Sequence, residues 1–203
     1  DNKDAARTGA YKLANEIGDE GQVILVVHDS NSETAKERVK SFEEEIKNNY
    51  PSVSIVETIY CDKLDDLKKK IAVEKDPNIS EDLQKAAVEK MTDDEVMQHY
   101  LKKYPDLKGV FGTNESSTIF ALEALQKTEL AGKVALVGFD IGEEQITAMK
   151  NGEIAGLVVQ NPFGMGYASV VAAARTILQS GNEAVVDTGY IWVTKDNLED
   201  ESI

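Results

Sequence analysis

Apolar runs of strand length alternate with stretches of helical periodicity along this chain, and this alternation limits the folds that it can adopt. The run QVILVVHD at 22–29 is apolar at nearly every position, which is typical of a strand buried on both faces. We expect further strands at 53–60, 107–114, 133–140, 154–160 and 186–194. Strands that alternate with helices predict an α/β fold, with a doubly wound, mostly parallel sheet and helices on both of its faces.

Helical stretches fill the intervals between these strands. At 32–50, the apolar residues Ala35, Val39, Phe42 and Ile46 recur on one helical face. The other expected helices lie before Gly18 and at 62–75, 117–127, 143–152 and 161–179.

Two of the later segments have their own signals. Residues 76–95 supply one or two extra helices before the strand at 107–114, and we interpret them as a helical insertion at the surface. Asn161 followed by Pro162 predicts the N-cap and the first residue of a helix that runs to about Gln179.

The composition excludes several classes of function. The 203-residue chain has 37 Asp and Glu against 22 Lys and Arg, a net charge of −15, which repels nucleic acids. Cys61 is the single cysteine and cannot form an internal disulfide. His28 and His99 have no metal-ligand spacing, and no nucleophile–base arrangement can be named. The sequence therefore predicts no catalytic residue, no metal site and no cofactor.

Each expected parallel strand finishes on a polar side chain. In chain order these are Asp29, Tyr60, Asn114, Asp140 and Gln160. The carboxyl ends of parallel strands share one edge of the sheet, where open α/β sheets bind their ligands. Carboxylates and amides suit a polyhydroxylated ligand, because every sugar hydroxyl both donates and accepts hydrogen bonds.

A structural role remains open for each of these side chains, because strands usually end in polar loops. Asp140 could cap the helix that begins at 143, and Asn114 could cap the helix that begins near Ser116. Gln160 is harder to explain in this way, since glutamine is a poor cap.

Arg38 is a further candidate, because it lies beside the buried stripe of its helix rather than opposite it. Its planar guanidinium could hold two neighbouring oxygens of a ligand. The alternative is a surface ion pair with Glu37 or Glu45.

Four motifs then show a resemblance to a known family. They are SETAKERVKSF at 32–42, YPDLKGVFGTNESSTIFALEAL at 104–125, the stretch 134–167 that contains VGFD and VVQNPFGMGY, and VDTGYIWVTKDN at 186–197. With them the chain resembles periplasmic sugar-binding proteins of the ribose-binding type, which are related to the effector domains of lactose-repressor-type regulators.

The resemblance implies a type I periplasmic-binding-protein-like lobe and a set of sugar contacts. The implied ligand-binding residues are Arg38, Asn114, Asp140 and Gln160, with Tyr60 and Asp62 as looser matches. Asp29 matches no such position.

The resemblance also implies that residues 1–203 form a carboxy-terminal lobe whose amino-terminal partner lobe is missing. The helix at 162–180 would cross to that first lobe in the family, so its apolar stripe lacks a partner here. This stripe consists of Val170, Val171, Ala174, Ile177 and Leu178. We expect an exposed apolar patch or a homodimer through this helix.

The function implied is extracytoplasmic binding of a monosaccharide for the membrane permease of a carbohydrate ABC transporter. Two alternatives stay open: a sugar-sensing domain that contacts a receptor kinase, and the effector-binding core of a lactose-repressor-type regulator. The first residues already have a helical pattern and no methionine, so we expect the natural start to lie upstream. A location in the periplasm or at the outer face of the membrane follows, with a lipid anchor on that upstream segment as one option.

Overall fold

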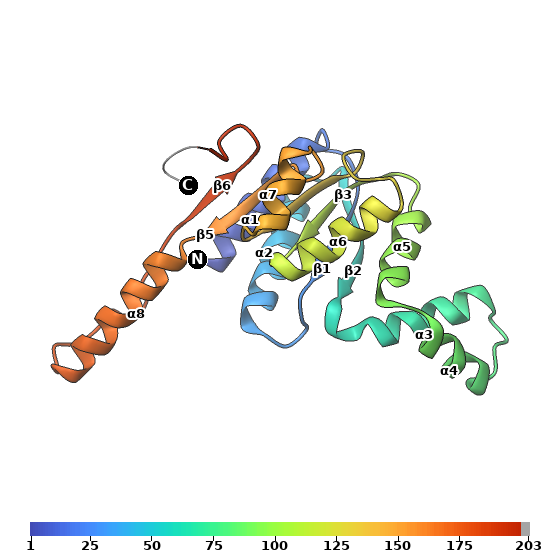
Figure 1. Cartoon of the computed structure of the whole chain (residues 1–203), viewed down its shortest axis with the longest axis horizontal. Coiled ribbons are helices and arrows are strands. Elements are labelled where there is room, and N and C mark those ends of the chain that lie inside the picture. The colour runs from blue at the N-terminus through green and yellow to red at the C-terminus, as the bar shows by residue number, and fades with distance from the viewer. Residues whose placement is uncertain (200–203) are drawn as a thin grey trace.

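A six-stranded sheet forms the centre of the computed structural model, which describes residues 1–199 (Figure 1). Its spatial order is β2-β1-β3-β4-β5-β6. The strands are β1 (Gly21–Val27), β2 (Val53–Tyr60), β3 (Leu107–Gly112), β4 (Ala135–Phe139), β5 (Gly156–Gln160) and β6 (Tyr190–Val193). The first five are parallel and β6 is antiparallel to β5, which confirms the mostly parallel sheet. The chain leaves β1 for β2 on one side and returns to β3 on the other, so the strand order reverses between β1 and β3.

Helices cover both faces of this sheet, as the pattern of apolar strands predicts. They are α1 (Asn2–Glu16), α2 (Glu33–Asn49), α3 (Leu64–Lys75), α4 (Glu81–Lys90), α5 (Asp93–Lys103), α6 (Glu115–Lys127), α7 (Glu143–Lys150) and α8 (Pro162–Ile177), with a short 3-10 turn, η1, at Cys61–Lys63. The buried faces of α1 and α2 pack on one side of the sheet, and those of α3, α5, α6 and α7 pack on the other.

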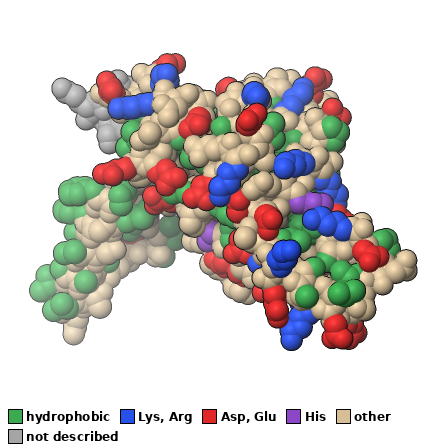
Figure 2. Space-filling model, turned by 45° about the vertical axis from the view of Figure 1, so that its right-hand side comes forward, with side chains coloured by type: hydrophobic (Ala, Val, Ile, Leu, Met, Phe, Trp, Pro, Cys, Tyr) green, Lys and Arg blue, Asp and Glu red, His purple; other side chains and the backbone are tan. Residues whose placement is uncertain are grey.

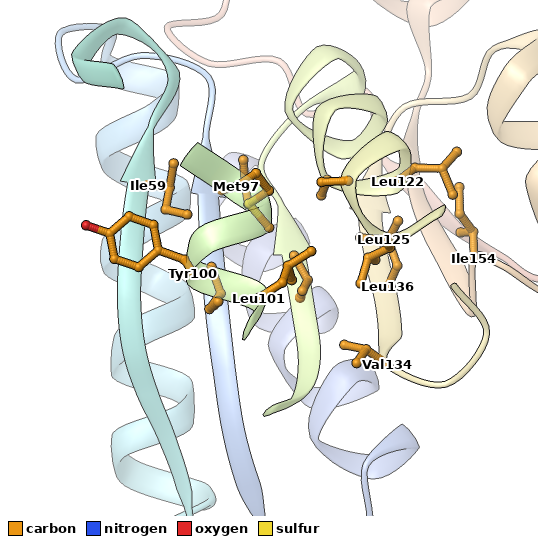
Figure 3. Packing of buried hydrophobic residues seen from close by; sticks show 14 of the residues in the cluster. Ile59, Met97, Tyr100, Leu101, Leu122, Leu125, Val134, Leu136 and Ile154 are labelled. Atoms are coloured by element: carbon orange, nitrogen blue, oxygen red, sulfur yellow. The ribbon is translucent and has the colours of Figure 1, made fainter. Parts of the chain in front are cut away.

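The two cores explain why β1 is apolar from Val23 to Val27. Val23 and Leu25 point into the core under α1 and α2, while Ile24 and Val26 belong to the opposite core. Figure 3 shows part of that second core, in which Met97 of α5 and Leu122 of α6 lie over the strands. The five residues Val23 to Val27 of β1 are thus all buried, on one face of the sheet or the other.

Two glycines bring α6 unusually close to the sheet. Thr118 of α6 lies directly over Gly112 of β3 and Gly138 of β4. A Cβ atom on Gly112 would lie 2.7 Å from the Cα of Thr118, and one on Gly138 would lie 2.9 Å from its Cβ. Because no larger residue fits, this contact fixes where α6 begins relative to the ends of the strands.

The segment expected as an insertion, 76–95, contains α4 and ends in the first turn of α5. α4 buries no residue, and it packs on α3 at the periphery. α5 begins at Asp93 behind a capping box between Thr92 and Glu95, and it buries Val96, Met97, Tyr100 and Leu101. The surface character therefore belongs to α4, whereas α5 is part of the core.

Most strands are shorter in the structure than the sequence predicts, by one or more residues at one end or both. β1 stops at Val27 rather than at residue 29, and β3 stops at Gly112 rather than at 114. β6 is only Tyr190–Val193 instead of 186–194, because its partner β5 offers four paired positions. His28 and Asp29 after β1, and Thr113 and Asn114 after β3, belong to the turns that follow, where the ladder has no further partner.

α8 projects away from the sheet as an arm (Figure 1). It begins as expected, since Asn161 accepts a hydrogen bond from the Gly164 amide at 2.8 Å, and it ends at Ile177. None of its residues is buried, and Val170 and Ile177 are 70% and 82% exposed. Figure 2 shows the hydrophobic side chains gathered on this arm. The expected exposed apolar patch is confirmed.

None of the helices within residues 1–199 has the length and apolar character needed to cross a membrane.

Candidate ligand-binding site at the carboxyl edge of the sheet

The four main candidate side chains converge at the carboxyl edge of the sheet. Asn114 follows β3, Asp140 follows β4 and Gln160 is the last residue of β5. Arg38 reaches the same edge from α2, where its Nη2 donates a hydrogen bond to Gln160 Oε1 at 3.1 Å. Asp140 Oδ2 accepts a hydrogen bond from the amide of Glu115, the residue after Asn114, at 3.2 Å.

Arg38 is buried and held by hydrogen bonds rather than by a surface ion pair. Its Nη1 donates to the Thr113 carbonyl at 2.5 Å, and its Nε and Nη2 donate to Asn2 Oδ1 at 3.2 and 3.1 Å. Its Cζ lies 4.1 Å from the centre of the Phe139 ring. Within residues 1–199 it forms no salt bridge, so the alternative of an ion pair with Glu37 or Glu45 is wrong.

The electrostatics of Arg38 follow from this burial. Burial lowers the pKa of Arg38, and the negative charge of Asp140 partly opposes that effect. A guanidinium nevertheless stays protonated, because its ordinary pKa is far above neutrality. The edge therefore contains a fixed positive charge with a carboxylate nearby.

A count of donors shows what the edge can offer to a ligand. A guanidinium has five N–H groups, and four of those of Arg38 are used by Asn2, Thr113 and Gln160. Among residues 1–199, the second N–H on Nη1 has no partner. The Nε2 group of Gln160 has no hydrogen-bond partner in the part of the chain that the structure describes.

Asn114 and Asp140 add groups of both kinds. Asn114 Oδ1 accepts from the Ser117 amide at 2.9 Å and from Ser116 Oγ at 3.0 Å, which confirms that Asn114 caps α6. Its Nδ2 group and the Oδ1 atom of Asp140 have no partner among residues 1–199. The edge thus presents several N–H donors together with one carboxylate oxygen, a set that matches hydroxyl groups.

Asp140 has a backbone conformation that few residues tolerate. Its φ is 64°, in the left-handed region where aspartate and asparagine are the favoured non-glycine residues. Its amide donates to the Val158 carbonyl at 2.9 Å, so the turn is tied to β5. Gly142, and not Asp140, is the N-cap of α7, which makes the capping alternative for Asp140 wrong.

Within residues 1–199, the looser candidates Tyr60 and Asp62, and also Asp29, form no hydrogen bond with the four main candidates. Asp62 accepts hydrogen bonds from the Ser30 amide at 3.0 Å and from Ser30 Oγ at 2.7 Å. Asp29 accepts from the amides of Asn31 and Ser32, and these hydrogen bonds lower its pKa to about 2. Both carboxylates therefore organise the loop after β1. Tyr60 ends β2, which β1 and β3 separate from β4.

Three neighbours of Arg38 were not expected from the sequence. Asn2 and Thr113 accept its hydrogen bonds, and His28 Nδ1 lies 2.8 Å from Thr113 Oγ1. Burial lowers the pKa of His28, with Asp29 opposing this effect and Arg38 adding to it. The apolar run that ends at His28 and the Asp1-Asn2 start of α1 were the available signals, and neither indicates a contact with Arg38.

An open cavity of about 720 Å³ adjoins the cluster between β5, α8 and the start of β6. Asp140 and Gln160 are among its polar lining residues, and Ile141, Phe163 and Met165 supply apolar side chains. Sugars have both hydroxyl groups and apolar C–H faces, so this mixed lining suits them. Among residues 1–199, no group of three or more His, Cys, Asp or Glu side chains could hold a metal ion.

Comparisons with known proteins agree with this geometry. The sequence model of a family described as a periplasmic binding protein domain matches residues 1–182. The ribose import binding protein of Salmonella typhimurium is 37% identical over 84 residues, which are 40% of this chain and 27% of that protein. The xylitol-binding protein of Mycolicibacterium smegmatis is 30% identical over 106 residues, 51% of this chain and 30% of that protein.

A solved structure extends the similarity to the whole chain. It is a carbohydrate transporter solute binding protein from Agrobacterium radiobacter in complex with D-arabinose, with a TM-score of 0.80 and 27% sequence identity. The match covers 100% of this chain and 62% of that chain. The chain therefore spans less than two thirds of the length of this structure, and its matches to the curated relatives cover less than one third of theirs.

Proposed function

This chain belongs to the periplasmic binding protein domain family, and we propose that it forms one lobe of an extracytoplasmic protein that binds a monosaccharide for a carbohydrate ABC transporter. The similarity to ribose import binding proteins and to a solute binding protein in complex with D-arabinose supports this class of ligand.

The observation that most strongly supports this proposal is that four polar side chains converge at one edge of the sheet: Arg38, Asn114, Asp140 and Gln160. Arg38 and Gln160 are in direct contact, and Asp140 is joined to the turn of Asn114 through the Glu115 amide. The unused N–H groups would donate to sugar oxygens, and Asp140 Oδ1 would accept from a sugar hydroxyl. An anionic ligand fits less well, because the carboxylate of Asp140 would repel it.

Transport would depend on closure of two lobes around the sugar. A ligand that bonds both lobes stabilises the closed arrangement, and the permease then recognises that shape. This chain would supply one side of the cleft, with the cavity under α8 facing the second lobe. Alone it would bind sugar weakly, because the cleft stays open to water.

Isothermal titration calorimetry of the chain tests the proposal, with D-ribose, D-arabinose and xylitol as ligands. We expect saturable binding of at least one of them and a loss of affinity of roughly tenfold or more in Asp140→Asn, since a hydrogen bond to a charged group contributes about 1.5–3 kcal/mol. Glu143→Gln, an exposed change of charge three residues later, is the matched control and should leave the affinity unchanged.

If none of these three sugars binds at high protein concentration, the result would contradict a sugar site on this chain. Equal affinities of wild type and Asp140→Asn would remove Asp140 from it.

A further inference from the structure

We propose that Asn2 is a positioning residue, which holds the Arg38 guanidinium so that its remaining N–H can face the ligand. This inference rests on the proposed function. Asn2 is the first residue of α1 and lies 36 positions from Arg38 in the sequence, so it was not among the candidates from sequence.

The geometry of the contact fixes the plane of the guanidinium. A single oxygen, Asn2 Oδ1, accepts hydrogen bonds from both Nε and Nη2 along one side of the group. Thr113 holds Nη1, and Gln160 accepts the second Nη2 hydrogen. Without Asn2, the Nε–H would have no partner within residues 1–199, and the group could turn about its last side-chain bonds.

Asn2 is itself held in place. Its Nδ2 donates to Glu37 Oε2 at 3.2 Å, and Glu37 also pairs with Lys3 at 3.4 Å. Asp1 caps α1 by accepting hydrogen bonds from the amides of Lys3 and Asp4 at 2.8 and 3.2 Å. α1 packs closely against α2 and the sheet, so the Asn2 oxygen sits on a rigid support.

The neutral charge of the Asn2 amide matters as much as its position. An amide oxygen orients the guanidinium without cancelling its positive charge, whereas a carboxylate would form an ion pair. Arg38 has no salt bridge within residues 1–199. Its charge therefore stays available to strengthen the hydrogen bond from Nη1 to a sugar oxygen.

Nuclear magnetic resonance of the arginine side chains tests the positioning without any ligand. The chain has three arginines, and Arg7 and Arg175 are exposed, so their Nε–H protons should exchange rapidly with water. We expect one slowly exchanging Nε–H signal, from Arg38, in the wild-type protein. This signal should be lost in Asn2→Ala and retained in Asn2→Asp, which keeps an oxygen in the same place.

Sugar affinity is the second readout. Asn2→Ala should bind the sugar roughly fivefold more weakly, less than the loss of a whole charged hydrogen bond, and Asn2→Asp should recover part of that loss. Asn15→Ala, an exposed change near the other end of α1, is the control and should alter neither readout. Thermal unfolding of each variant verifies that it folds.

Two results would overturn the inference. One is a wild-type Arg38 Nε–H that exchanges as fast as those of Arg7 and Arg175. The other is an Asn2→Ala protein that keeps both the protected signal and the wild-type affinity. If the wild-type protein binds no sugar while the signal behaves as expected, the proposed function fails and the positioning of Arg38 by Asn2 still stands.

Discussion

The close approach of α6 to the sheet gives the most specific prediction of the fold, because one residue, Thr118, contacts two glycines. Substitution of Gly138 by alanine places a Cβ against the Oγ1 and Cγ2 atoms of Thr118. Substitution of Gly112 by alanine meets Oγ1 as well, but it also lies 2.7 and 2.8 Å from the Cα and N of Thr118. Neither glycine has a positive φ, so the cost is steric.

The two substitutions should respond differently to Thr118→Ala. Overpacking in a core costs about 1–3 kcal/mol, and we expect Gly138→Ala to fall in this range. Thr118→Ala alone removes the hydrogen bond from Oγ1 to the Asn114 carbonyl at 2.7 Å, a loss of about 0.5–1.5 kcal/mol, together with a buried methyl group worth about 0.8 kcal/mol. In the double variant with Gly138→Ala the Oγ1 and Cγ2 atoms of Thr118 are gone, and only the Cβ at position 118 still lies close, at 2.9 Å. About 1–2 kcal/mol should therefore be regained relative to additivity.

Gly112→Ala is the matched comparison, because the backbone atoms of Thr118 stay in place. It should destabilise the protein more than Gly138→Ala, and Thr118→Ala should recover less of its cost. Urea unfolding followed by circular dichroism gives the free energy of unfolding for each member of both cycles. A Gly138→Ala protein as stable as the wild type, or strictly additive losses in its double variant, would refute the packing argument.

Three further predictions concern the side chains of His28 and Cys61 and the exposed face of α8. Burial lowers the pKa of His28 from its ordinary value of 6.5, so the neutral form stabilises the folded protein above pH 6.5. The free energy of unfolding should therefore decrease as the pH falls from 6.5 through the lowered pKa. An equally steep decrease in His28→Gln would contradict this. Burial raises the pKa of Cys61 to about 11, so its thiol should react with Ellman's reagent far more slowly in the native protein than in urea, and equal rates would argue against the burial. Because the apolar face of α8 is exposed, we expect the chain to self-associate as its concentration rises, measured by light scattering. The double variant Val170→Asp/Ile177→Asp should stay monomeric. A wild-type protein that is monomeric at all concentrations would count against this expectation.

The architecture could be predicted from sequence because both faces of the sheet are covered. A strand such as β1, buried on both faces from Val23 to Val27, has an unbroken apolar run that distinguishes it from a surface strand. The ends of strands were less certain, since the pairing of β6 depends on the short partner strand β5, which lies about 30 residues away. A strand end that is set by a partner distant in the sequence leaves no pattern in the residues around it.

The candidate residues divide in the same way. Asn114, Asp140 and Gln160 could be predicted because the carboxyl ends of parallel strands share one edge of the sheet. In the structure these three residues do lie at that edge. Asn114 caps α6 through its Oδ1 atom, while the Nδ2 group of the same side chain has no partner among residues 1–199. The partnership of Asn2 with Arg38 joins two helices by side chains alone, and neither helix carries a motif that indicates it.

The most direct measurement of the central claim follows the side-chain amide signals of Asn114 and Gln160 in a ¹H–¹⁵N spectrum while D-ribose or D-arabinose is added. The amide of Gln126, which bonds Glu153 at the opposite end of α6, is the internal control. We expect the signals of Asn114 and Gln160 to shift with a common saturation curve and that of Gln126 to stay in place. Saturable shifts confined to Gln126 and its surroundings, or no shifts at either candidate amide, would contradict a sugar site at the carboxyl edge of the sheet.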